Sequence, residues 1–403
     1  MKRFDWAELS SAERRAALAR PENRRDPRVI DTVRTIFAEI EAEGASALDR
    51  WSERLDGAPC RALALTPEAV DAARARLSAE DLSALETAAA NVTAFHAVDR
   101  PASGPEVAPV EGVALQRVWR PIATAGLYVP GGTAPLFSSL IMLAIPAAAA
   151  GVANRAVVTP PQKGGEAHPA MIAAAALCGL ERLFLVGGAQ AIAALTFGVG
   201  DVPRADKLFG PGNAYVAEAK RLAADLPGGP SIDMPAGPSE LLVIADASAD
   251  PDWIAADLLS QAEHDADAQV VLVTPEPSLV DRVEAALERQ LSDLPRAAVA
   301  RRALEQARAI VVRDLAEAAS ASDAYAPEHL SVQVEDPDAL TARLSAAGTV
   351  FVGRWSAETF GDYVSGPSHV LPTDGAARTW SGVSVQSFMK SFVVQRATAR
   401  GAA

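Results

Sequence analysis

The sequence has 403 residues, of which 49% are hydrophobic and 22% are charged, and its formal net charge is −14. A chain of this length and apolar content can bury a large core and is expected to divide into two or more domains. An acidic surface repels the phosphate groups of nucleic acids and anionic lipids, so small molecules and other protein subunits are the expected partners.

The N-terminal residues turn acidic after Lys2 and Arg3 and contain no apolar signal segment. The longest apolar stretch, residues 136–153, is rich in alanine and is interrupted by Pro146. This composition favours a helix packed inside the protein over a membrane span. We therefore expect a soluble cytoplasmic protein with no membrane partner.

Helical patterns dominate residues 66–98. Thr66 precedes a proline and is a predicted N-cap, and Ser78 and Asp81 have the spacing of a capping box. His96, near the end of this region, is expected to be packed or solvent-facing rather than a ligand.

After residue 113, short β-rich runs alternate with helical ones. Alternation at this spacing predicts parallel βαβ units with helices on both faces of each sheet. The two series are residues 155–159, 169–177 and 183–186, and later residues 241–245, 253–264 and 270–273. They predict an α/β fold with two Rossmann-like parallel-sheet domains, an N-terminal helical segment and a shortened C-terminal tail.

Glycine loops follow two of the predicted strands, at residues 186–190 and 209–213. A glycine loop that opens onto a helix presents free N–H groups and the positive end of the helix dipole to phosphate. The Gly-x-Gly-x-x-Gly fingerprint of dinucleotide-binding folds is absent, and glycine turns at strand ends are common. Phosphate binding and an ordinary turn therefore both stay open for these loops.

The two cysteines, Cys60 and Cys178, lie far apart in sequence and cannot form a disulfide framework or a thiolate zinc cluster. Cys178 follows an apolar, alanine-rich helical run. A buried, inert thiol is expected there rather than a nucleophile, which needs an exposed and electropositive setting.

Short polar patches carry the residue types that bind a borderline metal and move protons near neutral pH. Gln261 and His264 are three residues apart on a helix that is predicted to begin after Asp250. We expect them on one helix face, within reach of one ion. Asp362, beside a glycine, can add an anionic ligand from a flexible loop.

Glu328 and His329 follow Pro327. A proline favours an extended residue before it, here Ala326, and then a turn or a helix start. At a helix start the dipole favours an ionised Glu328 and a neutral His329, and both forms can accept protons. Taken alone, each of these polar patches is also compatible with a capped turn.

Nine ordered segments carry a more specific signal. They are residues 126–132, 187–195, 209–213, 233–240, 259–264, 325–330, 361–363, 369–373 and 381–385. Together they resemble the histidinol dehydrogenase family from near the start of the chain to about residue 391. The resemblance implies NAD-dependent oxidation of L-histidinol through the aldehyde to L-histidine, in two successive steps that close histidine biosynthesis.

The resemblance also implies one zinc ion, a homodimer and a set of site residues. Glu328 and His329 are the implied acid–base pair. The implied zinc ligands are Gln261, His264 and Asp362. The implied substrate contacts are Ser239, Gln261, His264, His329 and Asp362, and the implied NAD contacts are Tyr128, Gln190 and Asn213.

Domain boundaries are expected to follow the same resemblance. Residues 1–127 and 238–382 should form the first α/β domain, residues 128–237 the NAD-binding domain, and residues 383–403 a shortened dimerisation tail. In the family a helical tail ends in a glutamate and a histidine that reach into the partner subunit. Because no histidine follows His369, the fourth protein ligand of the zinc is expected to be missing, and His369 is a poor substitute.

Two alternatives stay open. A paralogue with the same fold could oxidise another small polar alcohol, and a silent or weakened subunit could keep the scaffold alone. Retention of a base and three metal ligands argues against a silent subunit.

Overall fold

The structure is a computed structural model that describes residues 1–20, 26–131, 136–235 and 237–402. The chain forms two compact units, and neither is continuous in sequence. Unit 1 comprises residues 1–25, 234–363 and 371–382, and unit 2 comprises residues 26–233, 364–370 and 383–403.

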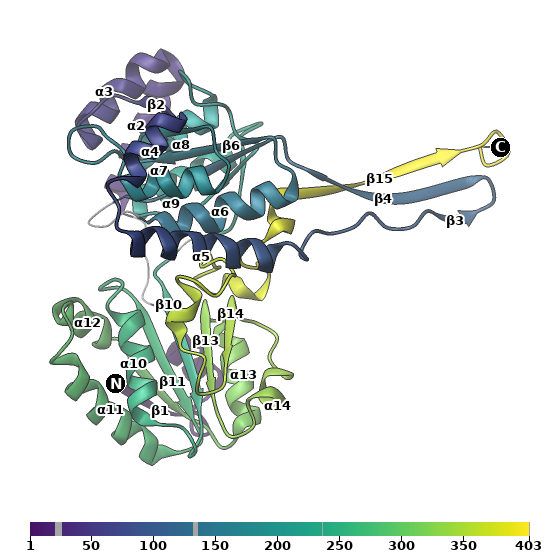
Figure 1. Ribbon diagram of the computed structural model, residues 1–403. Helices are drawn as coiled ribbons and strands as arrows, with labels where there is room; N and C mark the ends of the chain where they lie inside the picture. The colour runs from purple at the N-terminus through teal and green to yellow at the C-terminus, as the bar shows by residue number, and fades with distance from the viewer. Residues whose placement is uncertain (21–25, 132–135, 236, 403) are drawn as a thin grey trace. The chain divides into compact units, whose positions relative to one another are not determined.

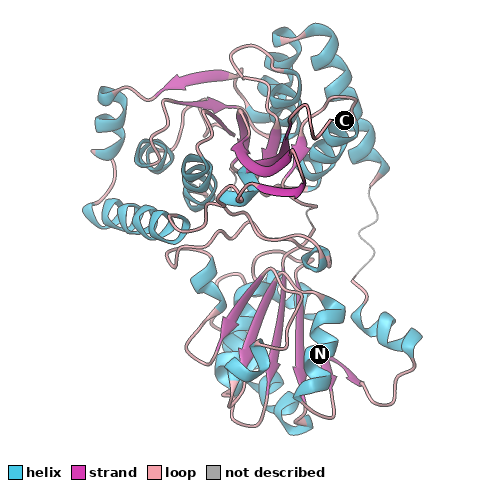
Figure 2. Cartoon of the chain, turned by 90° about the vertical axis from the view of Figure 1, so that its right-hand side faces the viewer, coloured by secondary structure: helices cyan, strands magenta, loops and turns pink. Residues whose placement is uncertain are grey.

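Unit 1 is built on a parallel sheet of six strands in the described part of the chain, in the order β1-β12-β11-β10-β13-β14. Figure 2 shows these strands side by side with helices around them. The strands are β1 (Lys2–Asp5), β10 (Glu240–Ala245), β11 (Gln269–Thr274), β12 (Arg308–Val311), β13 (His329–Gln333) and β14 (Thr349–Val352).

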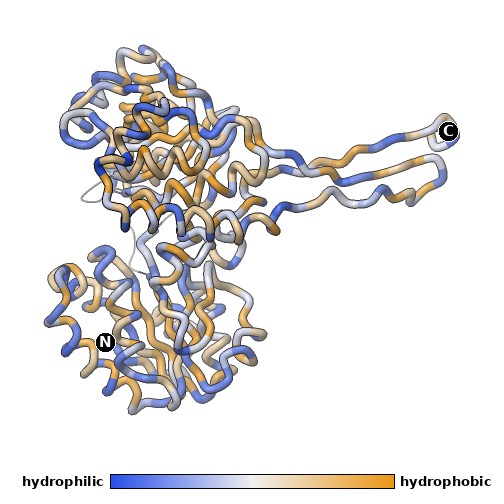
Figure 3. The backbone as a smooth tube through the Cα atoms, in the orientation of Figure 1, coloured by the Kyte–Doolittle hydropathy of each residue, from blue (hydrophilic) through white to orange (hydrophobic). Residues whose placement is uncertain are grey.

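Both faces of this sheet are covered by helices. Leu241 and Val243 pack into one apolar core and Leu242 and Ile244 into another, because successive side chains of a strand point to opposite faces. The first core includes α10 (Pro251–Ala262), α11 (Pro277–Leu291) and α12 (Ala297–Leu304), and the second includes α1 (Ser11–Leu18), α13 (Leu315–Tyr325) and α14 (Pro337–Thr341). Because β10 is buried on both faces, it is apolar from Leu241 to Ala245. Figure 3 colours apolar stretches of the chain orange.

Unit 2 has its own six-stranded sheet, in the order β2-β7-β6-β5-β8-β9. Its strands pair in parallel except for β2 at the edge, which is antiparallel to β7. The strands are β2 (Arg61–Ala64), β5 (Thr124–Tyr128), β6 (Asn154–Thr159), β7 (Arg182–Leu185), β8 (Lys207–Phe209) and β9 (Ser231–Ile232).

The helices of unit 2 form two groups. One group shares an apolar core with the sheet and consists of α2 (Pro27–Glu43), α3 (Ala45–Asp56), α8 (Gly188–Phe197) and α9 (Ala214–Asp225). The other group consists of α4 (Pro67–Arg74), α5 (Ala79–His96), α6 (Phe137–Ala150) and α7 (Pro169–Leu177). In this group α6 and α7 contact β5, β6 and β7, and α4 and α5 pack on α6 and α7. Among the described residues, none of the helices has both the length and the apolar character that crossing a bilayer requires.

A narrow antiparallel sheet projects from the rest of unit 2 (Figure 1). Its strands are β3 (Val107–Val110), β4 (Val113–Pro121) and β15 (Met389–Ala397). β15 pairs with β4 without interruption, from Met389 opposite Pro121 to Ala397 opposite Val113. The residues expected to form the C-terminal tail are therefore a 3-10 turn, η3 (Val385–Phe388), followed by a strand.

Local sequence signals are confirmed where they depend on neighbouring residues. The Thr66 side chain caps α4, and Ser78 and Asp81 form the capping box of α5. Asp250 caps α10, and Pro251 occupies its first position. The two α/β units with parallel sheets are also confirmed.

The compact units divide the chain differently from the expected domains. Residues 26–127 lie in unit 2 rather than with the first domain, because α2 packs against α8 and β2 pairs with β7. These contacts join segments more than 100 residues apart, so no local pattern could predict them.

A buried ion pair fixes the loop after β8 in unit 2. The Lys220 ammonium pairs with Asp233 and also donates to the Gly210 carbonyl at 2.9 Å, while the Gly210 N–H donates to Asp233 at 2.7 Å. We expect Lys220→Met to lower the free energy of unfolding by about 3–5 kcal/mol, because it removes the cation from a buried carboxylate.

Urea denaturation followed by tryptophan fluorescence measures this loss. Arg50→Met is the control in the same unit, because Arg50 pairs with Glu39 and Glu43 and all three side chains are exposed; it should cost less than about 1 kcal/mol. Equal losses for the two variants would contradict the role given to Lys220.

Candidate active site

Glu240, the first residue of β10, organises the polar residues of unit 1. Its side chain is 1% exposed and pairs with Arg20, whose guanidinium also donates to the Tyr325 carbonyl at 3.0 Å and lies over the Tyr325 ring. The Asp374 N–H donates to the same carboxylate at 3.0 Å. Burial raises the pKa of Glu240, and the Arg20 guanidinium opposes that rise.

The backbone of Glu240 holds two of the predicted catalytic residues. Its N–H donates to the Glu328 carboxyl at 2.8 Å, and its carbonyl lies 3.1 Å from Nδ1 of His329. A carbonyl oxygen can only accept, so Nδ1 carries the proton and the lone pair of the neutral ring is on Nε2. Glu328 and His329 are thus positioned by one peptide of the neighbouring strand.

Of the turn and the helix start that the sequence left open after Pro327, the helix start is not formed, and the extended conformation expected for Ala326 is wrong. His329 begins strand β13, and Ala326 has φ 54° and ψ 69° instead of an extended conformation. Ala326 ends α13 in the left-handed region, which costs a residue with a side chain on the order of 1 kcal/mol. This turn directs Pro327 and Glu328 toward β10.

The helix-dipole argument for an ionised Glu328 does not apply, because no helix begins at this point. Burial raises its pKa well above the ordinary value of 4.5, and the N–H of Glu240 only partly opposes that rise. The nearby carboxylates of Glu240, Glu358 and Asp362 raise it further. Without a helix dipole to favour the anion, Glu328 retains a proton to higher pH than an exposed glutamate.

A second cluster of polar side chains in unit 1 consists of residue types that bind metal ions. One ligand atom from each of His264, Glu358 and Asp362 lies within 4.8 Å of the other two. Nε2 of His264 is 3.6 Å from Asp362. Gln261 is fully buried, and neither polar atom of its side chain has a hydrogen-bond partner among the described residues.

His264 does not lie on the helix face that its spacing predicted. α10 ends at Ala262, and the His264 N–H donates to the Gln261 carbonyl at 3.2 Å in the turn that follows. The structure brings His264 and Asp362 together as expected. Glu358, which the sequence reading missed, joins them from a 3-10 turn, η1 (Glu358–Gly361). Its place four residues before Asp362 is the signal that could have revealed it.

These residues gather at the amino ends of the unit 1 strands. Ser239 directly precedes β10, Glu328 directly precedes β13, and α10 returns the chain to the same edge before β11 begins. Ligands of open α/β sheets usually bind at the carboxyl ends of the strands. Unit 1 therefore carries its polar site at the opposite edge.

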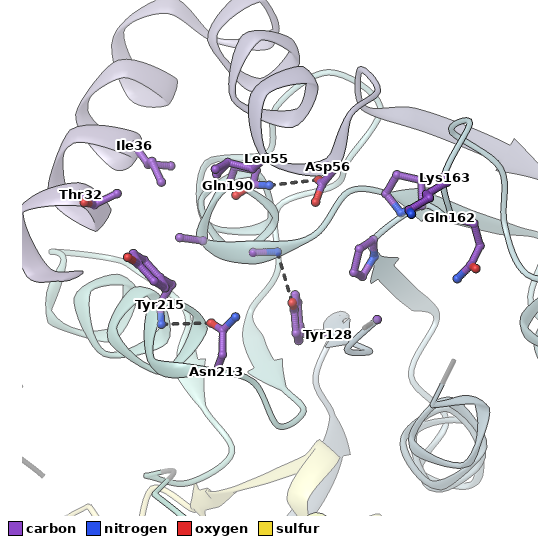
Figure 4. Close-up of a pocket in the computed structure, with 15 residues that line it drawn as sticks. Thr32, Ile36, Leu55, Asp56, Tyr128, Gln162, Lys163, Gln190, Asn213 and Tyr215 are labelled. Carbon is purple, nitrogen blue, oxygen red and sulfur yellow. Dashed lines mark hydrogen bonds between the residues drawn. The ribbon is translucent and has the colours of Figure 1, made fainter. Parts of the chain in front are cut away.

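Unit 2 has a cavity of about 700 Å³ at the carboxyl ends of its parallel strands. Figure 4 shows Tyr128, Gln190 and Asn213, the three residues expected to contact NAD, around this cavity together with Asp56. Tyr128 ends β5, which adjoins β6 on one side and β8 on the other. The position between β5 and β8 is a switch point of the strand order, where nucleotides bind in folds of this class.

The glycine loops of unit 2 do not present the free N–H groups that the sequence suggested. The Gly187 N–H donates to Asp56 at 2.9 Å, and the Gly188 N–H donates to the Tyr128 hydroxyl at 3.2 Å. Gln190 also donates to Asp56, at 3.0 Å. At the second loop, the Asn213 side chain accepts from the Tyr215 and Val216 N–H groups. Side chains of the cavity thus accept from two N–H groups at each helix start.

The remaining histidines have other partners. Nε2 of His369 is hydrogen-bonded to the Ser139 hydroxyl at 2.8 Å within unit 2, and His168 caps α7. His96 is buried beside Asp99. Cys178 is buried as expected, and burial raises its thiol pKa to about 12.

Comparison with known proteins gives a consistent result. The histidinol dehydrogenase family model matches residues 18–403. The histidinol dehydrogenases of Salmonella choleraesuis and Xanthomonas euvesicatoria are 46% and 47% identical to the chain, cover 99% and 100% of it, and are themselves covered over 91% and 93% of their length. The crystal structure of histidinol dehydrogenase from Elizabethkingia anophelis is similar with a TM-score of 0.93 and 41% identity, over 100% of this chain and 91% of that one.

The pair of His264 and Asp362 predicts a pH response in the metal-free protein. The hydrogen bond that protonated His264 donates to Asp362 raises the pKa of His264 above 6.5, and burial opposes that rise. The stabilisation that protonated His264 provides is therefore complete below pH 6.5 and is lost as the pH rises through the raised pKa. We expect Asp362→Asn to lower the pKa of His264.

Imidazole NMR titration measures this change, and the chain has only five histidines to assign. Asp267→Asn, which alters an exposed carboxylate nearby in sequence, should leave the titration unchanged. A His264 pKa that is the same in wild type and Asp362→Asn would show that the two side chains do not interact.

Proposed function

Because the chain belongs to the histidinol dehydrogenase family, which makes it an oxidoreductase of histidine biosynthesis, we propose that it oxidises L-histidinol to L-histidine in two successive NAD-dependent steps with one bound zinc ion. The observation that carries this proposal is the attachment of Glu328 and His329 to the two backbone groups of Glu240. It gives a buried acid and a base of defined tautomer on adjacent residues.

Alcohol oxidation removes a proton from the hydroxyl group and a hydride from the carbon that carries it. His329 is suited to take the proton, because Nδ1 is engaged by the Glu240 carbonyl and the lone pair is on Nε2. The hydride passes to NAD. The product of this first step is the aldehyde.

The second step adds water to the aldehyde, and the hydrate then loses a hydride to a second NAD. His329, having released the first proton to solvent, takes a proton from the attacking water, and protonated Glu328 donates one to the aldehyde oxygen. The raised pKa of Glu328 suits that task, since an acid–base group works best when its pKa is near the working pH. Loss of the hydride and of two protons from the hydrate then leaves the carboxylate of histidine.

The residues of unit 1 have the donor types that zinc prefers. Gln261 has a buried amide without a hydrogen-bond partner among the described residues, and His264 and Asp362 lie close enough to share an ion. A bound zinc ion fixes the polar groups of the substrate and makes its hydroxyl proton easier to remove. Ser239, at the same edge of the sheet, is a further proposed contact for histidinol.

We place NAD in the unit 2 cavity. Tyr128, Gln190 and Asn213 line it and are the proposed contacts. The position at a switch point of the strand order supports this choice. These assignments come from the resemblance to the family, which also implies a homodimer. We propose that the protein acts as a cytoplasmic homodimer.

The first test is the number of NADH molecules produced per L-histidinol consumed, with zinc added and again after chelation. We expect two NADH per histidinol and loss of activity on chelation. One NADH would show that the reaction stops at the aldehyde. No NADH from a protein that binds zinc would refute histidinol as the substrate.

The second test addresses the acid–base pair. We expect Glu328→Gln and His329→Asn each to lower kcat by about 10²–10⁴-fold, the range that positioned proton transfer contributes. NAD affinity should be unchanged, because the proposed NAD contacts belong to unit 2. Glu335→Gln, an exposed glutamate shortly after the same strand, is the control with unchanged kcat, and an equal loss in all three variants would contradict the assignment.

A further inference from the structure

Glu358 is a buried carboxylate that the reaction described above does not use. It is 1% exposed, and burial is the largest cause of its raised pKa. One oxygen accepts from the Ser260 hydroxyl at 2.5 Å, and the other, Oε1, has no hydrogen-bond partner among the described residues. A buried anion with one satisfied oxygen is costly unless a cation compensates it.

In the described part of the chain, lysine and arginine do not supply that compensation, and His264 supplies it only when its ring is protonated. No lysine or arginine among the described residues forms an ion pair with Glu358. The hydroxyl of Ser260, in the last turn of α10, donates to the Glu358 carboxylate and holds it beside the end of that helix. Helix C-termini carry a partial negative charge, which also favours a cation at this point.

The backbone directs Glu358 and Asp362 to the same side. Glu358 begins η1, and Asp362 is the residue that caps it, four positions later. Together with His264 they have ligand atoms within 4.8 Å of one another, whereas ligands that share one zinc at bonds of ~2.1 Å lie about 3.3 Å apart in a tetrahedral site. Closure around an ion thus requires side-chain movements of roughly 1.5 Å or less.

We propose that Glu358 is a further protein ligand of the zinc ion, so that a single chain supplies Gln261, His264, Glu358 and Asp362. This inference rests on the zinc site of the proposed function and adds a residue to it. Charge supports the addition: Gln261 and neutral His264 carry no charge, so Asp362 alone leaves one net positive charge on the ion, and Glu358 cancels it. The unpartnered Oε1 is the atom that binds.

The test compares zinc affinities of metal-free proteins, measured by competition with a chromophoric chelator and with Zn²⁺ as the probe. We expect Glu358→Gln to weaken zinc binding at least ~100-fold, the upper end of what residues around a metal site contribute without binding it directly. Glu263→Gln is the matched control. Glu263 also carries one negative charge close to His264, but its carboxylate is not among the ligand atoms of His264, Glu358 and Asp362 that lie together. Its loss should change the zinc affinity by less than about threefold.

Ser260→Ala separates binding from positioning. It removes the hydrogen bond to Glu358 but keeps the carboxylate, so zinc should bind with a loss well below that of Glu358→Gln. If Glu358→Gln and Glu263→Gln weaken binding equally, Glu358 acts only through its charge and the proposal is overturned. Should Glu358→Gln not fold, Glu358→Ala takes its place, with the zinc-dependent rise in unfolding temperature as the readout and the same comparison with Glu263→Gln.

Failure of this inference can be told apart from failure of the proposed function. A wild-type protein that produces NADH from histidinol, with a Glu358→Gln variant of wild-type zinc affinity, rejects Glu358 as a ligand and keeps the function. A wild-type protein that binds zinc through Glu358 but does not oxidise histidinol keeps the ligand and rejects the substrate.

Discussion

The chemistry proposed for unit 1 depends on one residue, Glu240, and on the buried ion pair that fixes it. Its N–H and carbonyl hold Glu328 and His329, and its carboxylate is held by Arg20 from 220 residues earlier in the chain. Arg20 also binds the carbonyl of Tyr325, at the end of the helix that leads into the catalytic pair. One guanidinium thus positions both the strand that orients the acid and base and the turn that delivers them.

The proposed zinc site of unit 1 lies at the amino edge of its sheet, and the proposed NAD site of unit 2 lies at the carboxyl edge of its own. The electrostatics of helix ends explains this difference. Helices that connect parallel strands begin at the carboxyl edge and end at the amino edge. The amino edge of unit 1 therefore collects helix C-termini, such as that of α10, whose partial negative charge favours a cation. The carboxyl edge of unit 2 collects helix N-termini such as that of α8, whose partial positive charge favours the phosphates of a dinucleotide. Each edge suits the ligand that we assign to it.

Sequence reading succeeded where a feature depends on neighbouring residues. The caps at Thr66, Ser78 and Asp250 are local, and so is the alternation of strand and helix. The sequence did not show what raises the pKa of Glu328, because its burial comes from elements distant in sequence. Ala326 departs from the preference of residues before proline because the end of α13 imposes a left-handed turn. Glu358 was missed because only the fold brings it to His264, 94 positions away along the chain.

The interleaving of the two units has a consequence for synthesis on the ribosome. β1, at residues 2–5, pairs with β12, at residues 308–311, and β4 pairs with a strand that begins at residue 389. At about 5–20 residues per second, roughly 15–60 s pass between emergence of the first strand and of its partner. During that time β1 has no neighbour in its sheet, and neither unit can be completed before translation is nearly finished. Codon-dependent changes in elongation rate and access to chaperones should therefore affect the yield of this protein more than that of one whose domains are contiguous.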